Sequence, residues 1–466
     1  MKLHLYNTLT ERVEELAPER PPELRMYVCG LTVYGRGHIG NFRTFLATDL
    51  LRRTLRYKGV PVREVMNITD VDDRIIQLAG EAGSDLRGFT EQHVRAFEED
   101  LATLRMERPE VVPRATEHVP AMVELVRRLE ERGLTYRADG SVYFRIAGFP
   151  EYGRLSKLDS AGIQSGARVD TDKYDKENAR DFVLWKAKSD EPEWARWDAP
   201  FGRGRPGWHL ECSAMSMEYL GETFDLHCGG VDLTFPHHEN EIAQASGATG
   251  KPFARHWMHV EHLLIENVTM SKSRGNDYKL PDLLDGGYRA DAIRYLLCSA
   301  HYRKQMNFTW EGLKQAAAAL ERIHGFADRL AEVERHGPCG QAAEAIAARA
   351  DAAFDAALCD DLNTPEALAA VHGLVNEGNA LLAEGSPTRG DAERLLGQLE
   401  RMDVVFAVLQ PESATLGTRE RELFEARQEA RRQRDFARAD ALRAELDGLG
   451  IVLEDSANGT RWRRKR

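Results

Sequence analysis

Residues 26–68 read MYVCGLTVYGRGHIGNFRTFLATDLLRRTLRYKGVPVREVMNI, and this stretch decides the fold. A short apolar run at 26–29 is followed by a glycine-rich loop. From 41 to 58 apolar residues recur at helical spacing, and Gly59 ends that helix. Residues 62–68 then read as a second strand. A strand, a helix and a strand in this order predict a right-handed crossover and a parallel sheet.

The same order of elements returns further along the chain. Residues 223–228 and 256–266 read as strands, with a helix at 237–246 between them. Residues from about 111 to 207 have a weaker periodicity and read as an insertion that splits the sheet. We therefore expect an α/β fold, with a Rossmann-like, parallel-sheet catalytic domain over residues 1–310.

The remainder of the chain is predicted to be mainly helical. Residues 311–408 are rich in alanine and leucine and read as a helical bundle domain. Residues 410–418 read as a linker. A small C-terminal domain at 419–466 is expected to hold one helix, 419–446, and a short extended stretch at 450–454.

Charge and cysteine content exclude several classes of protein. The net charge is −12, with +3 on residues 419–466 and −15 on the first 418 residues. This balance argues against indiscriminate coating of nucleic acid, while the basic end suits either local RNA contact or a solvated helical tail. Six cysteines without a C-x-x-C pair are too few for a disulfide scaffold. Neither a secretion signal nor a run of about 18 apolar residues is present, so we expect a cytoplasmic protein without a membrane span.

The glycine-rich loop also matches a dinucleotide-binding fingerprint. Gly35, Gly37 and Gly40 have the G-x-G-x-x-G spacing, and Glu64 follows 24 residues after Gly40. A nicotinamide-dependent oxidoreductase is therefore one alternative. The loop residues 31–34 weaken it, because they separate the strand from the first glycine and the tight turn is not where the fingerprint requires it.

Two short motifs suit nucleotide chemistry. The first is HIGN at residues 38–41, at the start of a predicted helix, where backbone N–H groups favour an anion. There His38 could donate to a phosphate oxygen, and Gly40 would allow an adenine or a ribose to approach the backbone. The second is TMSKS at 269–273, in which Lys272 could neutralise the charge of a leaving pyrophosphate. Alone, each motif also reads as an ordinary cap or turn.

Together and in this order, the two motifs resemble the HIGH and KMSKS signatures of class I aminoacyl-tRNA synthetases. Asn41 stands at the position of the second histidine and Thr269 at that of the first lysine. The resemblance implies an ATP site, with Mg²⁺ arriving on the nucleotide. Its catalytic residues would be His38, Asn41 and Lys272, and Gly40 would join them in binding ATP.

Cys29, Cys212, His237 and Glu241 are candidate metal ligands. His237 and Glu241 are four residues apart and therefore project from one face of a helix. Cys29 ends the first strand, at the edge where the strands of a parallel sheet open onto one crevice. The pattern alone leaves open that these are four unrelated residues.

Longer motifs narrow the family. They are CGLTVY (29–34), NITDVDD (67–73), GWHLECS (207–213) and FPHHENE (235–241). In this order they resemble the cysteinyl-tRNA synthetase family, over almost the whole chain. The resemblance implies that Cys29, Cys212, His237 and Glu241 hold one zinc ion and that the sulfur of the substrate enters its shell, because zinc prefers thiolate to hydroxyl.

The implied function is that of a monomeric enzyme that activates L-cysteine with ATP and transfers it to the 3′ end of tRNA(Cys). The amino-acid pocket would be shaped by Thr69, Trp208, His227 and Asp232. Contacts to anticodon bases would come from Arg431, Asp440 and Asp455. Two further alternatives stay open: a cysteine ligase that acts on an amino sugar, which would not need residues 419–466, and an RNA-binding relative without catalysis.

Overall fold

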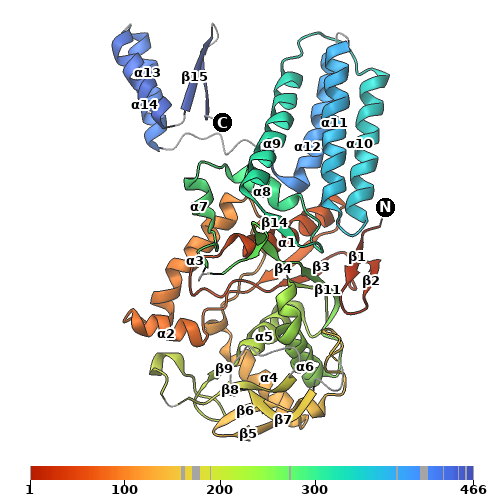
Figure 1. Cartoon of the computed structure of the whole chain (residues 1–466), viewed down its shortest axis with the longest axis vertical. Helices are drawn as coiled ribbons and strands as arrows, with labels where there is room; N and C mark the ends of the chain where they lie inside the picture. Colours follow the sequence, from red (N-terminus) through yellow and green to blue (C-terminus); the bar gives the residue numbers. More distant parts are fainter. Residues whose placement is uncertain are drawn as a thin grey trace. The chain divides into compact units, whose positions relative to one another are not determined.

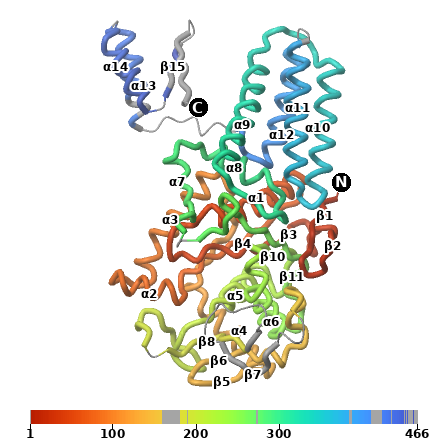
Figure 2. Tube along the Cα trace, viewed as in Figure 1, coloured from red at the N-terminus to blue at the C-terminus, as the bar shows by residue number. Residues whose placement is uncertain are grey.

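The computed structural model describes most of the chain. It covers residues 2–158, 163–169, 179–188, 190–271, 274–384, 387–409, 418–433, 435–449, 451–456 and 459–464. The chain forms two compact units, Met1–Val408 and Leu409–Arg466, which are described separately (Figures 1 and 2). Among the described helices, none combines the length and the apolar character needed to cross a membrane.

A four-stranded parallel sheet forms the centre of the first unit. In spatial order its strands are β11 (Ala254–Val260), β10 (Phe224–Gly230), β3 (Leu24–Val28) and β4 (Val62–Met66). Helix α1 (Ile39–Tyr57) connects β3 to β4, so the strand–helix–strand prediction for residues 26–68 is confirmed. Most strand residues are buried, because helices cover both faces of the sheet.

The two faces of the sheet carry different helices (Figure 1). Helix α1 contacts β4, β10 and β11, and it also packs against α8 (Ala290–Cys298). Helix α5 (Trp208–Leu220) contacts β3 and β4, and it packs against α4 (Val119–Glu131) and α6 (Glu239–Thr249). This arrangement brings the starts of α1, α5 and α6 close to the carboxyl ends of the strands.

The strand predicted at 256–266 is in fact two strands. The first is β11 of the central sheet, and the second joins a small separate sheet made of β12 (Leu263–Ile265), β13 (Val268–Thr269) and β14 (Met306–Phe308). Between them, the backbone N–H of Glu261 donates to the carbonyl of Tyr302 (2.8 Å), which takes the chain out of the central sheet.

The helix predicted at 237–246 begins two residues later than expected. Phe235 has an extended backbone (φ −142°, ψ 135°), and the segment Thr234–His238 forms a separate turn before α6 starts at Glu239. His237 therefore lies in the turn while Glu241 lies in the first turn of the helix, although the two side chains still face one another.

The insertion folds as helix α4 followed by a second sheet. Its strands are β5 (Thr135–Ala138), β6 (Ser141–Phe144), β8 (Ala179–Lys186) and β7 (Ile163–Val169) in spatial order, with β9 (Arg205–Pro206) paired to β8. Asp73, the first residue of α2 (Asp73–Glu81), accepts a hydrogen bond from the buried Lys186 (2.9 Å) and is also paired with the buried Arg205. These ion pairs tie α2 to the insertion.

The rest of the first unit is a hairpin, connecting helices and a helical bundle. The hairpin is β1 (His4–Asn7) and β2 (Arg12–Glu15), and the connecting helices are α3 (Leu86–Thr103) and α7 (Leu280–Asp285). The predicted bundle is formed by α9 (Trp310–Ala331), α10 (Gln341–Cys359), α11 (Thr364–Glu384) and α12 (Arg389–Phe406), which lie side by side (Figure 1).

The second unit differs from the prediction in two respects. The single helix expected at 419–446 is two helices, α13 (Thr418–Arg432) and α14 (Phe436–Gly448), because Asp435 caps α14 by accepting from the backbone N–H of Arg438. The expected extended stretch is β15 (Ile451–Ser456), and it pairs with a strand that was not predicted, β16 (Gly459–Arg464). A small apolar core of Leu446, Ile451 and Leu453 holds these elements together.

Candidate active site and metal centre

A cavity of about 300 Å³ lies at the carboxyl ends of β3, β4 and β10. Eight of the predicted site residues line it: Cys29, His38, Asn41, Thr69, Trp208, Cys212, Asp232 and His237. Gly40, His227 and Glu241 do not line the cavity: Gly40 adjoins His38, Glu241 contacts His237, and His227 lies one residue further back, against Glu241. The predicted Lys272 lies outside the described residues.

His38 and Asn41 form the N-terminal cap of α1 together. The backbone N–H of Asn41 donates to Nδ1 of His38 (3.2 Å), and the side-chain oxygen of Asn41 accepts from the backbone N–H of His38 (3.0 Å). Burial and the nearby charge of Lys279 lower the pKa of His38. The ring is therefore neutral with its hydrogen on Nε2, which leaves this nitrogen as a donor at the cavity.

Gly40 brings the two predicted nucleotide motifs together. A Cβ atom at this position would collide with the methyl group of Met270, from the TMSKS segment, and would lie 3.1 Å from Nδ1 of His38. That Gly40 lets a nucleotide lie against the backbone stays a prediction. The glycine allows the loop after β13 to close over the start of α1.

Lys279 is a cavity residue that the sequence analysis missed. It lines the cavity, and its backbone pairs with that of His38. Its ammonium group donates to the carboxylate (2.7 Å) and the carbonyl (2.9 Å) of Asp277. Lys279 lies seven residues after Lys272, beyond the motif, and only the backbone pairing reveals its position next to His38.

The four candidate metal ligands converge behind the cavity. Their ligand atoms all lie within 4.8 Å of one another, and all four residues are buried. The sulfur atoms of Cys29 and Cys212 are 3.8 Å apart, and Nε2 of His237 is 3.1 Å from Oε1 of Glu241. Two thiols, an imidazole and a carboxylate form a donor set that suits a borderline-soft ion such as zinc.

The electrostatics of this group also suit a cation. Burial opposes the ionisation of Cys212, but the Cys29 thiol and the charge on His237 outweigh it and lower the pKa of Cys212 to about 6. Burial likewise opposes the ionisation of Glu241, but His227 and His237 lower its pKa to about 2. Two anionic donors thus face one buried point at neutral pH, which a metal ion would neutralise.

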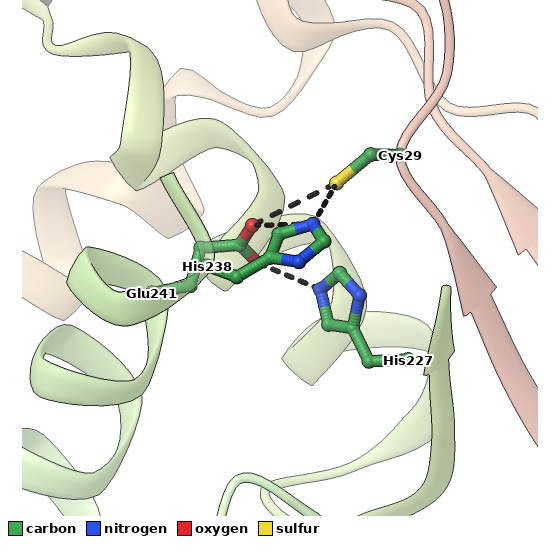
Figure 3. Close-up of side chains that lie close together, drawn as sticks. All are labelled: Cys29, His227, His238 and Glu241. Carbon is green, nitrogen blue, oxygen red and sulfur yellow. Dashed lines mark hydrogen bonds and ion pairs between the residues drawn. The ribbon is translucent and has the colours of Figure 1, made fainter. Parts of the chain in front are cut away.

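A second set of possible ligands overlaps the first (Figure 3). It consists of Cys29, Glu241, His227 and His238. Nε2 of His238 is 3.3 Å from the Cys29 sulfur, and Nε2 of His227 is 2.9 Å from Oε2 of Glu241. The two sets share Cys29 and Glu241, and of the residues in which they differ, Cys212 and His237 line the cavity whereas His227 and His238 do not.

The predicted amino-acid pocket is partly brought together. The rings of Trp208 and His237 are tilted to one another with centroids 4.3 Å apart, and Thr69 accepts a hydrogen bond from the side chain of Asn67 (3.2 Å). Asp232 lines the same cavity. His227 is fully buried behind Glu241 and stacks on Trp257 (4.5 Å), so it acts on the cavity only through other residues.

Comparisons with known proteins identify the family. The family model "tRNA synthetases class I (C) catalytic domain" matches residues 15–318, a DALR domain matches 353–410, and a cysteinyl-tRNA ligase anticodon binding domain matches 414–463. The chain is 49% identical to the cysteine–tRNA ligase of Solibacter usitatus and 45% identical to that of Koribacter versatilis, each over the full length of both chains. The chain belongs to the cysteine–tRNA ligase family.

Solved structures agree on the fold. A methionyl-tRNA synthetase of Mycobacterium tuberculosis in complex with methionyl-adenylate has a TM-score of 0.58 at 16% identity, over 83% of this chain and 90% of the other. A leucyl-tRNA synthetase of Agrobacterium radiobacter in a ternary complex has a TM-score of 0.60 at 12% identity, over 85% and 86%. The predicted Rossmann-like fold class is therefore confirmed.

Membership of the cysteine–tRNA ligase family overturns the oxidoreductase alternative. The glycine fingerprint is a coincidence of spacing: Leu31, Thr32 and Tyr34 line the cavity between β3 and the glycines, where the fingerprint requires a tight turn. Glu64, the candidate ribose-binding acid, is buried on β4 and paired with Arg52 (2.8 Å).

The residues predicted to contact the anticodon lie in the second unit. A guanidinium nitrogen of Arg431, on α13, lies 3.5 Å from the hydroxyl of Thr460 on β16, and Asp455 on β15 is the backbone partner of Thr460. Arg431 and Asp455 therefore lie near one position of the hairpin. Asp440 is exposed on α14, and the structure does not join it to the other two.

Proposed function

We propose that this chain is a cysteine–tRNA ligase, which joins L-cysteine to the 3′ end of tRNA(Cys) at the expense of ATP. The observation that carries the proposal is a buried group of two cysteines, a histidine and a glutamate opening onto the cavity that holds the HIGN segment. Full-length relatives carry the same activity in their names. The domain roles would be catalysis for 1–310, a bundle for 311–408 and anticodon binding for 419–466.

Recognition of cysteine would depend on the buried donor group. Cys29, Cys212, His237 and Glu241 would hold one zinc ion, which supplies a soft acceptor for the sulfur of the substrate. An apolar pocket separates near-isosteres such as cysteine and serine by only about 1–3 kcal/mol. Because serine offers a hydroxyl, a poorer and less acidic donor, selectivity at this site would not require a separate editing domain.

The remaining pocket residues would orient the amino acid. Asp232 offers a carboxylate at the cavity wall that can accept from the α-ammonium group, and Trp208 and Thr69 limit the space available to the side chain. His227 holds Glu241 by a hydrogen bond (2.9 Å) and would keep its other oxygen directed at the metal position.

Activation would use the residues at the start of α1. His38 and Asn41 would donate hydrogen bonds to the phosphates of ATP, and Lys279 and Lys272 would offset their charge, with Mg²⁺ arriving on the nucleotide. A carboxylate oxygen of cysteine would attack the α-phosphorus, a P–O bond would form, and the bond to pyrophosphate would break. Positioning and charge stabilisation suffice for this step, so no protein nucleophile is needed.

The first test is cysteine-dependent exchange of pyrophosphate into ATP, followed by charging of tRNA(Cys). Exchange with cysteine but not with serine, together with about one zinc per chain by elemental analysis, is the expected result. Charging of tRNA would also exclude the amino-sugar alternative, to which the match of an anticodon binding domain at 414–463 already runs counter. We further propose that the protein is cytoplasmic and monomeric. Light scattering on the purified chain would test the monomeric state.

Substitution Cys212→Ser gives the sharper test of the thiol-recognition role. We expect the KM for cysteine to rise by roughly 100-fold or more, since losing a direct ligand should exceed the effect of losing a residue behind one. The KM for ATP should stay within about threefold, because His38, Asn41 and Lys279 are unchanged. An equal loss of both affinities would contradict the proposed role.

A further inference from the structure

The segments that follow β3 and β4 lie against one another beside the proposed active site. The backbone N–H of Thr69 donates to the carbonyl of Leu31 (3.1 Å), and the N–H of Val33 donates to the carbonyl of Thr69 (3.0 Å). Gly30 lies so close to the second segment that a Cβ atom at this position would be 1.6 Å from the carbonyl oxygen of Asn67. The backbones of the two segments therefore hold each other in place, and what remains to be fixed at Thr69 is its side chain.

Asn67 joins the two segments through its side chain. Its Oδ1 accepts from the backbone N–H of Gly30 (2.9 Å), the residue after the candidate ligand Cys29, and its Nδ2 donates to Oγ1 of Thr69 (3.2 Å). Asn67 lines the cavity, although it is only 1% exposed. Because a backbone N–H can only donate, the contact with Gly30 fixes which end of the amide is the oxygen, and the NH₂ group faces Thr69.

The hydroxyl of Thr69 continues this series of hydrogen bonds to α5. Because Oγ1 accepts from Asn67, its own hydrogen is available to a second partner. That partner is the buried Glu211: burial raises the pKa of Glu211, and a hydrogen bond from Thr69 opposes the shift. The Oε2 atom of Glu211 is buried without a hydrogen-bond partner in the described part of the chain, and Glu211 directly precedes the candidate ligand Cys212. The series Gly30–Asn67–Thr69–Glu211, here called the relay, thus connects the residues next to the two cysteines, whose sulfur atoms are 3.8 Å apart.

We propose that Asn67 is a positioning residue for cysteine recognition, which holds Thr69 and the segment of Cys29 in one arrangement beside Cys212. This inference rests on the proposed function. Without the amide, the Thr69 side chain can rotate about its Cα–Cβ bond, and the N–H of Gly30 loses its partner at the end of β3. The pocket wall and the spacing of the two thiols would then change together. Replacing a group behind a metal ligand changes metal affinity or activity by about 10–100-fold.

The test uses Asn67→Asp, Glu211→Gln and the two changes combined, in the full-length enzyme. Asn67→Asp keeps the acceptor for Gly30 but places two carboxyl groups around the Thr69 hydroxyl, which has one hydrogen to donate. In pyrophosphate exchange the KM for cysteine should rise about tenfold and the KM for ATP should stay within about twofold. Glu211→Gln keeps an acceptor for Thr69 and should have a smaller effect, about threefold.

The combined variant reverses the direction of the relay. The new amide at position 211 can donate to Thr69, and the Thr69 hydroxyl can donate to the new carboxylate at position 67. Most of the affinity for cysteine should therefore return, although each single change lowers it. A role of Asn67 in general stability alone would not produce this rescue, since the second change adds no other contact to Asn67.

Binding of cobalt(II) to the metal-free protein supplies a measurement that does not depend on turnover. The visible absorption of the ion reports the geometry of its ligands. Asn67→Asp should shift these bands and weaken cobalt binding about tenfold, and the combined variant should restore both. Thr69→Val interrupts the relay at a second point with a side chain of similar shape, and it should shift the bands even if Asn67→Asp does not fold.

Asn379→Asp is the matched control, because Asn379 lies on α11 in the bundle, where its side chain accepts from Arg329 (2.8 Å). It should change neither the cobalt bands nor the KM for cysteine. Cobalt bands and a KM for cysteine that stay at their wild-type values in Asn67→Asp would overturn the inference. An equal rise in the KM for cysteine and for ATP, or a combined variant no better than Asn67→Asp, would also overturn it. Absence of cysteine-dependent exchange in wild type would instead refute the proposed function.

Discussion

Two of the candidate metal ligands are protonated at neutral pH without a metal ion. Burial and the neighbouring Cys212 raise the pKa of Cys29, and the charges of Glu241 and Cys212 outweigh burial and raise the pKa of His237 to about 10. Both groups must lose a proton before they can bind a metal ion. The zinc affinity should therefore increase with pH over the range below these pKa values.

We predict that zinc binding at pH 7.5 releases about two protons, one from Cys29 and one from His237. Titration calorimetry in buffers of different ionisation enthalpy measures this number directly. Cys212→Ser should weaken the binding and reduce the number of protons released, because Cys212 helps to raise the pKa of both Cys29 and His237. Release of no protons, or an affinity independent of pH between 6 and 8, would show that these residues do not bind the ion.

Lys279 is the second residue whose role can be isolated. Substitution Lys279→Met should raise the KM for ATP about tenfold, through the loss of one charge-assisted contact. It should also raise the pKa of His38, which Lys279 lowers, and so move the acid limb of the exchange rate to higher pH. Lys279→Arg should restore most of the affinity. Lys314→Met, at an exposed lysine on α9, should change neither the KM for ATP nor the pH dependence of exchange. A similar effect of Lys314→Met would argue against a specific role of Lys279.

At the scale of elements, helices and strands could be predicted where apolar residues recur at a clear periodic spacing. Helix α1 and its flanking strands were predicted to within about two residues, because a buried α/β crossover needs a long amphipathic helix between two apolar runs. The strand at 256–266 was predicted as one, because the break at Glu261 depends on a distant partner, Tyr302. Strand β16 was missed since its arginines read as a charged tail, although pairing with β15 makes it a strand.

The candidate site likewise contains some residues that the sequence predicts and others that it does not. The four candidate metal ligands follow from motifs that resemble those of the family, and the structure brings them together. The overlapping pair His227 and His238 could not, because nothing in the local sequence distinguishes a histidine that faces a cavity from one that lies behind it. Lys279 could not be predicted from its neighbours in the sequence either. It lies at the cavity because its backbone pairs with that of His38, about 240 residues away in the sequence.

The contact between α2 and the insertion gives a prediction at this scale. Burial raises the pKa of Asp73, but Arg205 and Lys186 outweigh it and lower the value to about 2. A lowered carboxyl pKa contributes stability that is present above its unfolded value, near 3.8, and is lost as the pH falls toward 2. Asp73→Asn should therefore lower the free energy of unfolding at pH 7 by about 1–2 kcal/mol, a modest figure because the side chain is 44% exposed.

Urea unfolding at pH 7 and at pH 2.5 measures the difference in free energy of unfolding between wild type and Asp73→Asn. This difference should be smaller at pH 2.5. Glu151→Gln is the control, because Glu151 pairs with Arg154 on the surface and both side chains are more than half exposed. A difference that stays constant between the two pH values would mean that Asp73 acts through packing and not through its charge.

For the whole molecule, the chain divides into two compact units, and the residues proposed for activation lie in one unit while those proposed for anticodon contact lie in the other. The first unit contains the active-site cavity and the candidate metal centre, and its last residues are fixed within it: the carbonyl of Phe406 accepts from Arg294 (2.5 Å) and that of Val408 from His324 (3.2 Å). The second unit has its own small core around Leu446. Each unit therefore has the internal contacts that an independently folded domain needs.

Deletion of residues 410–466 should leave cysteine-dependent pyrophosphate exchange within about threefold of wild type, because every residue assigned to activation remains. The kcat/KM for charging of tRNA(Cys) should fall about 100-fold or more, through the loss of anticodon contacts worth about 1–3 kcal/mol per stacked base. In the full chain, Arg431→Ala should reproduce part of that loss, whereas Arg432→Ala should not, since Arg432 is exposed on α13 and pairs with the neighbouring Glu429. A truncated chain that charges tRNA as well as wild type would mean that recognition resides in the first unit.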